Sequence, residues 1–301
     1  MTNKMTGKRI LIYLLIVFGL VWGVMIPYFL CGGSYDSQTT NFILTFSMLC
    51  PAIAALVTRK VTKEGFPVTG KGSLLLGIDL KNHKWIWFVI ALTGPIIYFD
   101  LGELLYYAIF PQAFDLSALD AVGIPRNLLF LVPLSGISTA FLVSFGALGE
   151  EIGWRSYLYP KLEELYGTTK AVALGGVIWG VWHFPAIYAG HNFGHGYFGE
   201  PWTGFAVFTV FTIAVGTILF YLTKKTGSVW VAAFMHAANN IFSGATVLGL
   251  TYSDERLSGA ALQSPLRLLI LSVPVIIISL FILLKPLKKE SAATCRAAKE
   301  C

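Results

Sequence analysis

Long apolar runs separated by short polar or turn-rich segments make up most of the chain. A helix needs about 20 consecutive, mostly apolar residues to cross the hydrocarbon core of a bilayer, which is roughly 30 Å thick. The runs that approach this length between charged or turn residues are 10–30, 42–57, 85–106, 128–148, 171–189, 203–222, 229–248 and 268–284. The pattern therefore predicts an all-α, polytopic integral membrane protein with about eight transmembrane helices enclosing a polar cavity.

Composition excludes a water-soluble globular protein. The 301 residues are 55% hydrophobic and only 13% charged, whereas a soluble surface needs roughly 25–35% charged residues. The predicted spans absorb nearly all of this hydrophobic excess and leave no room for a separate soluble domain. We expect a single transmembrane domain over residues 1–290, with a motif-bearing core at about 128–249, and a short cytoplasmic tail over 291–301.

The basic residues predict the orientation of these spans. The chain has 22 Lys and Arg against 16 Asp and Glu, a net charge of +6. When the loops are assigned alternately to the two sides, 19 of the bases fall on one side, and Arg126, Arg256 and Arg267 fall on the other. Cytoplasmic loops carry such an excess, so we expect both termini in the cytoplasm. The surplus indicates a lipid bilayer as partner and no nucleic acid.

Several ionisable or amide side chains lie inside the predicted spans or directly continue them, where polar groups are costly and mark functional sites by default. They are Asp100, Glu103, Glu150, Glu151, Arg155, His183, His236, Asn239 and Asn240. These residues are the candidates for chemistry.

The first candidate group continues the fourth predicted span. Glu151 and Arg155 are i, i+4 partners on a helix, so an ion pair can neutralise both. Glu150 points about 100° away and is left free for chemistry. The alternative is that all three only anchor the helix end at the interface.

Two further groups lie on later spans. His236 and Asn240 are also i, i+4 and share a helix face, although such residues can simply join packed helices. His183 lies in the fifth predicted span, where it is either functional or a core histidine that satisfies backbone groups freed by Pro185.

These residue types permit two chemistries. A buried carboxylate beside an imidazole can take a proton from water, and a second histidine with an amide can stabilise the oxyanion of a tetrahedral intermediate. Alternatively, Glu150, His183 and His236 could bind zinc and leave a fourth position for water. The spacing leaves the zinc and metal-free schemes open.

The order of the motifs resembles a known family. The matching positions are Glu-Glu-x-x-x-Arg at Glu150, Glu151 and Arg155, aromatic-x-x-x-His at Trp179 and His183, and His-x-x-x-Asn at His236 and Asn240. This set is similar to the CAAX protease and bacteriocin-processing (CPBP) family of intramembrane endopeptidases, which includes type II CAAX prenyl endopeptidases. The family often has Phe where Trp179 stands, a departure that we expect to matter little.

The resemblance implies an eight-helix membrane protease, a peptide hydrolase of metalloprotease or glutamate type, whose cavity opens to the cytoplasm. It implies removal of a C-terminal tripeptide from prenylated CAAX substrates. Glu150 and His183 would activate water, and His236 and Asn240 would form the oxyanion site or help to hold a metal. Glu151 and Arg155 would be supporting residues.

The implied partner is a prenylated or otherwise membrane-associated polypeptide, and the implied location is the cell membrane or an endoplasmic-reticulum-type membrane. Two other functions stay open. A proton- or ion-coupled transporter could use Asp100, Glu103, Glu150 and His183 as a pathway. A non-enzymatic immunity or scaffold protein could have the same fold. A metal site at His191 and His195 is disfavoured, because the glycine-rich segment around them does not favour a helix.

Overall fold

The computed structural model describes residues 3–253 and 263–284, with only the backbone of residues 263 and 264. The predicted tail, 291–301, lies outside the described residues. Within these ranges the protein is built from helices and contains no strand, apart from an isolated bridge between Phe114 and Tyr252. It is an all-α, polytopic membrane protein, as the hydrophobic pattern predicts.

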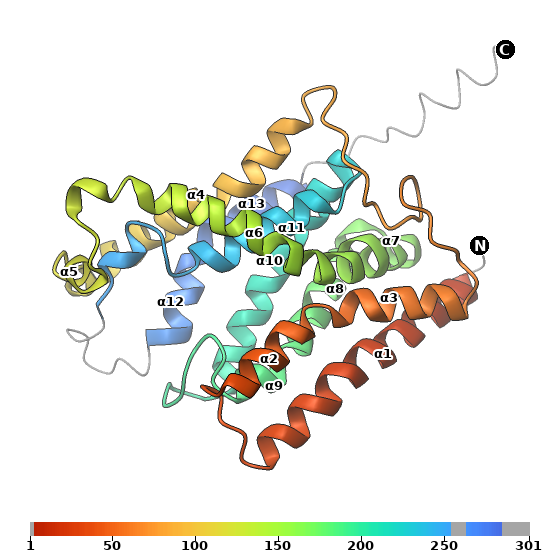
Figure 1. Cartoon of the computed structure of the whole chain (residues 1–301), viewed down its shortest axis with the longest axis horizontal. Coiled ribbons are helices and arrows are strands. Elements are labelled where there is room, and N and C mark those ends of the chain that lie inside the picture. Colours follow the sequence, from red (N-terminus) through yellow and green to blue (C-terminus); the bar gives the residue numbers. More distant parts are fainter. Residues whose placement is uncertain (1–2, 254–262, 285–301) are drawn as a thin grey trace.

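The elements follow one another along the chain as shown in Figure 1. The α-helices are α1 (Asn3–Leu30), α2 (Gln38–Ser47), α3 (Cys50–Val61), α4 (Trp85–Ile109), α5 (Ala118–Val122), α6 (Leu131–Gly153), α7 (Tyr159–Tyr166), α8 (Thr168–Trp182), α9 (Phe184–Tyr188), α10 (Trp202–Thr226), α11 (Trp230–Phe242), α12 (Gln263–Leu271) and α13 (Val273–Leu284). A π-helical turn, Trp154–Leu158, joins α6 to α7. Short 3₁₀ turns occupy Pro111–Ala113, Arg126–Leu128 and Gly249–Thr251.

Five helical segments are long and apolar enough to cross a membrane. They are Asn3–Leu30, Gln38–Val61, Trp85–Ile109, Leu131–Tyr166 and Trp202–Thr226. The pair Pro265–Leu271 and Val273–Leu284, bent by 47°, makes a sixth if it is counted as one span. These segments correspond to six of the spans that the hydrophobic pattern predicts.

The remaining two predicted spans, 171–189 and 229–248, form shorter helices. The 15 residues of α8 and the 13 of α11 are about 22 and 20 Å long at 1.5 Å per residue, less than the hydrocarbon thickness. Helix α8 ends at His183 because Pro185, in the first turn of α9, has no N–H to continue its ladder. Hydrophobicity alone does not report this break. This break places His183 at the end of a helix inside the protein.

Close backbone packing positions the short helices. Helix α11 packs between α6 and α4, and α8 packs against α10 and α7. A Cβ at Gly176 of α8 would lie 2.4 Å from the Cα of Ile213 in α10, so this approach requires glycine. The hydroxyl of Thr212 donates to the Gly176 carbonyl at 2.9 Å and joins the same two helices.

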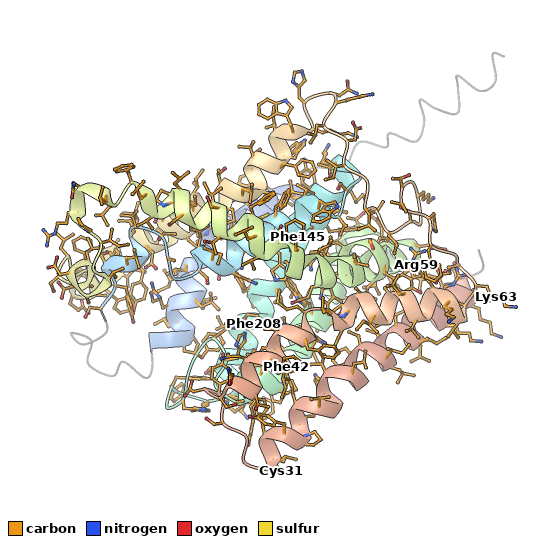
Figure 2. All side chains as sticks on the ribbon, in the orientation of Figure 1. Cys31, Phe42, Arg59, Lys63, Phe145 and Phe208 are labelled. Carbon is orange, nitrogen blue, oxygen red and sulfur yellow. The ribbon has the colours of Figure 1, made fainter. Side chains whose placement is uncertain are left out.

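Basic residues gather at one end of the bundle. Figure 2 shows Arg59 and Lys63 at the end of α3 that lies near the N-terminus, far from Cys31. At this end Glu64 forms ion pairs with Lys161 at 2.8 Å and Arg9 at 3.4 Å. Arg9 and Lys161 therefore connect α1 and α7 to the end of α3 through Glu64. The side of the membrane that this end faces stays a prediction.

Candidate active site

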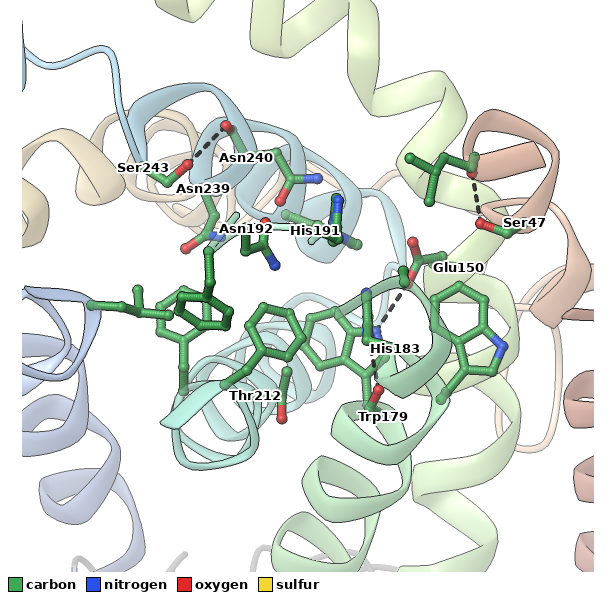
Figure 3. A pocket seen from close by; sticks show the side chains of 18 of the residues that line it. Ser47, Glu150, Trp179, His183, His191, Asn192, Thr212, Asn239, Asn240 and Ser243 are labelled. Carbon is green, nitrogen blue, oxygen red and sulfur yellow. Dashed lines mark hydrogen bonds between the residues drawn. The ribbon is translucent and has the colours of Figure 1, made fainter. Parts of the chain in front are cut away.

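One cavity of about 560 Å³ lies among α1, α2, α6 and α8–α12 and is closed in part by the segment 191–193. Its polar lining, much of it drawn in Figure 3, consists of Thr45, Ser47, Glu150, Trp179, His183, His191, Asn192, Thr212, His236, Asn239, Asn240, Ser243 and Arg267. The structure thus brings Glu150 and His183 into one cavity with His236 and Asn240 of α11. His183 faces this cavity and not the lipid.

Glu150 is buried and is held through one of its oxygens. Its side-chain Oε2 accepts hydrogen bonds from the indole N–H groups of Trp179 at 2.9 Å and Trp154 at 3.2 Å. Among the described residues nothing donates to Oε1. Figure 3 shows the bond from Trp179 across the cavity wall. The carboxylate is therefore fixed in orientation while one oxygen remains available to a ligand.

Trp179 thus has a role that the resemblance did not suggest. Phenylalanine, which the family often has at this position, has no N–H group and could not donate to Glu150. Trp179 therefore supplies a hydrogen bond to Glu150 that phenylalanine would lack, and whether this departure matters little for activity stays a prediction. The Trp179 ring also stacks on the Arg155 guanidinium, whose carbon lies 4.0 Å from the ring centroid.

Glu151 forms a separate buried network. The i, i+4 ion pair predicted from the spacing is present, with Arg155 Nη1 at 3.0 Å from Glu151 Oε1 and both side chains fully buried. The same Oε1 lies 2.7 Å from His236 Nδ1. Because carboxylates orient a histidine ring by accepting its N–H, Glu151 leaves Nε2 of His236 as the ring nitrogen for a ligand. The π-helical turn that carries Arg155 is a local geometry often found at functional sites.

His183 is oriented by the backbone. Its Nδ1 lies 2.8 Å from the carbonyl oxygen of Trp179, and a carbonyl can only accept, so Nδ1 carries the proton. In the neutral ring, Nε2 then has a free lone pair. Rings of Trp182 and Phe208 pack edge-on against it, with centroids 4.7 and 4.9 Å away. His183 is therefore a hydrogen-bond acceptor toward the cavity.

Two adjacent asparagines line the cavity from α11. Asn240, which the spacing singles out, is exposed, and its backbone carbonyl accepts from Ser243 Oγ at 3.1 Å. Asn239 is buried, and its Oδ1 accepts from the hydroxyl of Tyr98 on α4. That bond occupies the amide oxygen of Asn239 and leaves its NH₂ group available as a donor. No spacing rule links Tyr98 to α11, so only the tertiary structure finds it.

The predicted zinc ligands do not form a ligand set in this arrangement. Among the residues described, no three His, Cys, Asp or Glu side chains lie close enough together to hold a metal ion. The hydrogen bonds of the three predicted ligands leave Oε1 of Glu150 and Nε2 of His183 and His236 free, as in metal-bound histidines, so it is the separation of the three side chains that argues against a shared metal in this arrangement. The other histidine pair also diverges, since His191 bonds Tyr35 and His195 bonds Glu200.

The acidic residues of α4 do not join this cluster. Glu103 is buried and paired with Arg267 of α12, and neither Glu103 nor Asp100 lines the cavity.

Fold and site together define a class, the polytopic membrane proteins that hold a Glu–His–His–Asn set in an internal cavity. Residues 132–242, which carry every motif residue, match the family model described as type II CAAX prenyl endopeptidase Rce1-like. CAAX prenyl protease 2 of Methanococcus maripaludis is 30% identical over 107 residues, which are 35% of this chain and 39% of the relative. The match therefore spans about two fifths of that relative's length. The resemblance read from the motifs is confirmed for this segment.

Proposed function

We propose that this protein is an intramembrane endopeptidase that hydrolyses a peptide bond with water activated by Glu150 and His183. The observation that carries the proposal is that Glu150, His183, His236 and Asn240 line one cavity and all lie within residues 132–242, which match the Rce1-like family model. A cavity lined by both apolar and polar groups also suits a lipidated peptide.

In the first step, water binds between Glu150 Oε1 and His183 Nε2, both of which are acceptors. Glu150 removes one proton as the water oxygen attacks the carbonyl carbon, and His183 accepts a hydrogen bond from the other hydrogen. The two indole donors keep Glu150 aligned while its charge changes. Their N–H groups also stabilise the carboxylate before the reaction.

As the water attacks, the carbonyl oxygen of the scissile bond becomes negatively charged. The NH₂ group of Asn240 or of its neighbour Asn239 donates to it, and protonated His236 donates through Nε2 while Glu151 balances the ring's charge at Nδ1. The tetrahedral intermediate then collapses. The C–N bond breaks, and the proton taken by Glu150 passes to the leaving amine, which restores the carboxylate.

The substrate that these comparisons favour is a protein or peptide with a prenylated CAAX-type terminus, from which the C-terminal tripeptide is removed. The family description names a CAAX prenyl endopeptidase and the curated relative a CAAX prenyl protease. The apolar cavity wall, formed in part by Met25, Met48 and Phe211, is chemically suited to an isoprenoid chain. In this proposal the substrate enters from the membrane.

The proposal is tested with purified protein in liposomes and a fluorescent prenylated CAAX peptide. Wild-type protein should release the tripeptide, and His183→Ala should lose about 100-fold of the rate, because it removes the acceptor that positions the attacking water, and misplacing a reactant by about 1 Å can cost 10²-fold. His195→Ala is the matched control, since His195 is exposed and does not line the cavity. Full activity of His183→Ala, or no cleavage by the wild type, would contradict the proposal.

A further inference from the structure

Arg267 stands apart from the other cavity residues. Among the described residues that line the cavity, no other Lys or Arg is present. Arg267 lies on α12, outside the segment 132–242 that matches the family. None of the mechanistic steps above uses its charge.

The guanidinium of Arg267 is held in place but not saturated. Its Nη2 donates to Glu103, and its carbon lies 3.9 Å from the ring centroid of Tyr252. The side chain is 18% exposed, and Nε is buried with no hydrogen-bond partner in the described part of the chain. Nε and Nη2 share one edge of the guanidinium, so the buried Nε lies on the edge that Glu103 occupies, where Oε2 of Glu103 also lacks a partner among the described residues. Nη1, to which no described residue is bonded, is the group left for a ligand in the cavity.

A structural tie between α4 and α12 explains the bond to Glu103 and the stacking on Tyr252. It does not explain why the guanidinium lines the cavity. An arginine with Nη1 left over on a cavity wall fits a site that becomes complete when an anion binds. Leu268 and Leu271 from the same helix line the wall beside it, and such an apolar surrounding strengthens an arginine–carboxylate pair.

We propose that Arg267 binds the C-terminal carboxylate of the substrate. This inference rests on the proposed function, because a CAAX-type substrate ends in a free carboxylate three residues beyond the cleaved bond. Three extended residues span about 10 Å, a distance within a cavity of this size. Arg267 and Glu150 line the same cavity, so a terminus anchored at Arg267 would present a peptide bond near the end of the substrate to Glu150. Arg267 is thus a specificity-determining residue for tripeptide release.

The test compares two prenylated peptides that differ only at the C-terminus, one a free acid and the other an amide. Wild-type protein should cleave the acid with a kcat/KM about 10- to 100-fold higher, the range expected for one charge-assisted pair. In Arg267→Gln this preference should fall to about one, mainly through loss of activity on the acid. A purely structural role would lower both rates and keep their ratio.

Arg126→Gln is the matched control, because Arg126 is an exposed arginine paired with Asp120 at 3.5 Å and should keep the wild-type preference. If Arg267→Gln does not fold, inhibition of the wild type by the product tripeptide replaces it. The acid should then inhibit at least 10-fold more strongly than the amide. Equal cleavage of both peptides by wild type, or an unchanged preference in Arg267→Gln, overturns the carboxylate site alone. Absence of cleavage of either peptide by wild type instead contradicts the proposed function.

Discussion

Glu150→Gln is the substitution that separates the chemistry of the site from its architecture. The side-chain carbonyl oxygen of the introduced glutamine can accept both indole N–H groups that now bind Oε2 of Glu150. Its amide NH₂ replaces Oε1, to which no described residue donates. Glutamine has nearly the same shape but cannot take a proton at neutral pH. The variant should fold and bind substrate without activating water.

The substitution should greatly lower the rate and change the stability of the fold only slightly. A general base contributes about 10²–10⁴-fold to the rate, which corresponds to about 2.7–5.5 kcal/mol of barrier. The stability of the fold should change much less. The two indole bonds each weaken by about 1 kcal/mol when their acceptor loses its charge, and removal of a carboxylate that is only 4% exposed offsets that loss.

The assay measures kcat and KM for a prenylated CAAX peptide in liposomes, together with thermal unfolding of the purified protein. We expect kcat to fall at least 100-fold with KM within about threefold of wild type. Glu163→Gln is the control, because Glu163 lies on α7, pairs with Lys224 at 2.6 Å and does not line the cavity. If Glu150→Gln retains more than a tenth of the wild-type kcat, Glu150 is not the base.

Four further outcomes are expected. Trp179→Phe removes one N–H donor of the base and should lower kcat/KM about tenfold; an unchanged value would show that the indole bond is dispensable. Arg155→Met breaks a fully buried pair with Glu151 and should cost about 3–5 kcal/mol in SDS unfolding, whereas a cost below 1 kcal/mol would contradict this. Because no three ligands converge among the described residues, chelator-treated protein should keep its activity, and a loss restored by zinc would favour the metal scheme. Burial lowers the pKa of His191 to about 4 from an ordinary 6.5, so the loop 189–201 should be fully stable above about pH 6.5 and lose stability as the pH falls through about 4. Hydrogen exchange of that loop, corrected for intrinsic exchange rates, measures this change. The variant Tyr35→Phe, which lacks the hydroxyl that bonds His191, is measured for comparison. Protection that does not vary with pH would refute the prediction.

The pairing of the two glutamates shows how far spacing alone can reach. Helical periodicity predicts the bond between Glu151 and Arg155 because both residues lie on one helix, four positions apart. It also predicts that Glu150 points elsewhere. It could not predict what Glu150 meets, since Trp179 comes from α8 and reaches it only through the packing of that helix.

Local and non-local physics divide the rest of the protein in the same way. The sequence by itself determined the all-α membrane class, the positions of the apolar segments and the four candidate side chains, because hydrophobic runs, charges and i, i+4 spacing are local properties. The lengths of α8 and α11, the bond from Tyr98 to Asn239 and the place of Arg267 on the cavity wall depended on tertiary structure. Each involves side chains or backbones brought together from distant helices, and the free energy of such contacts is not encoded in any single stretch of the chain.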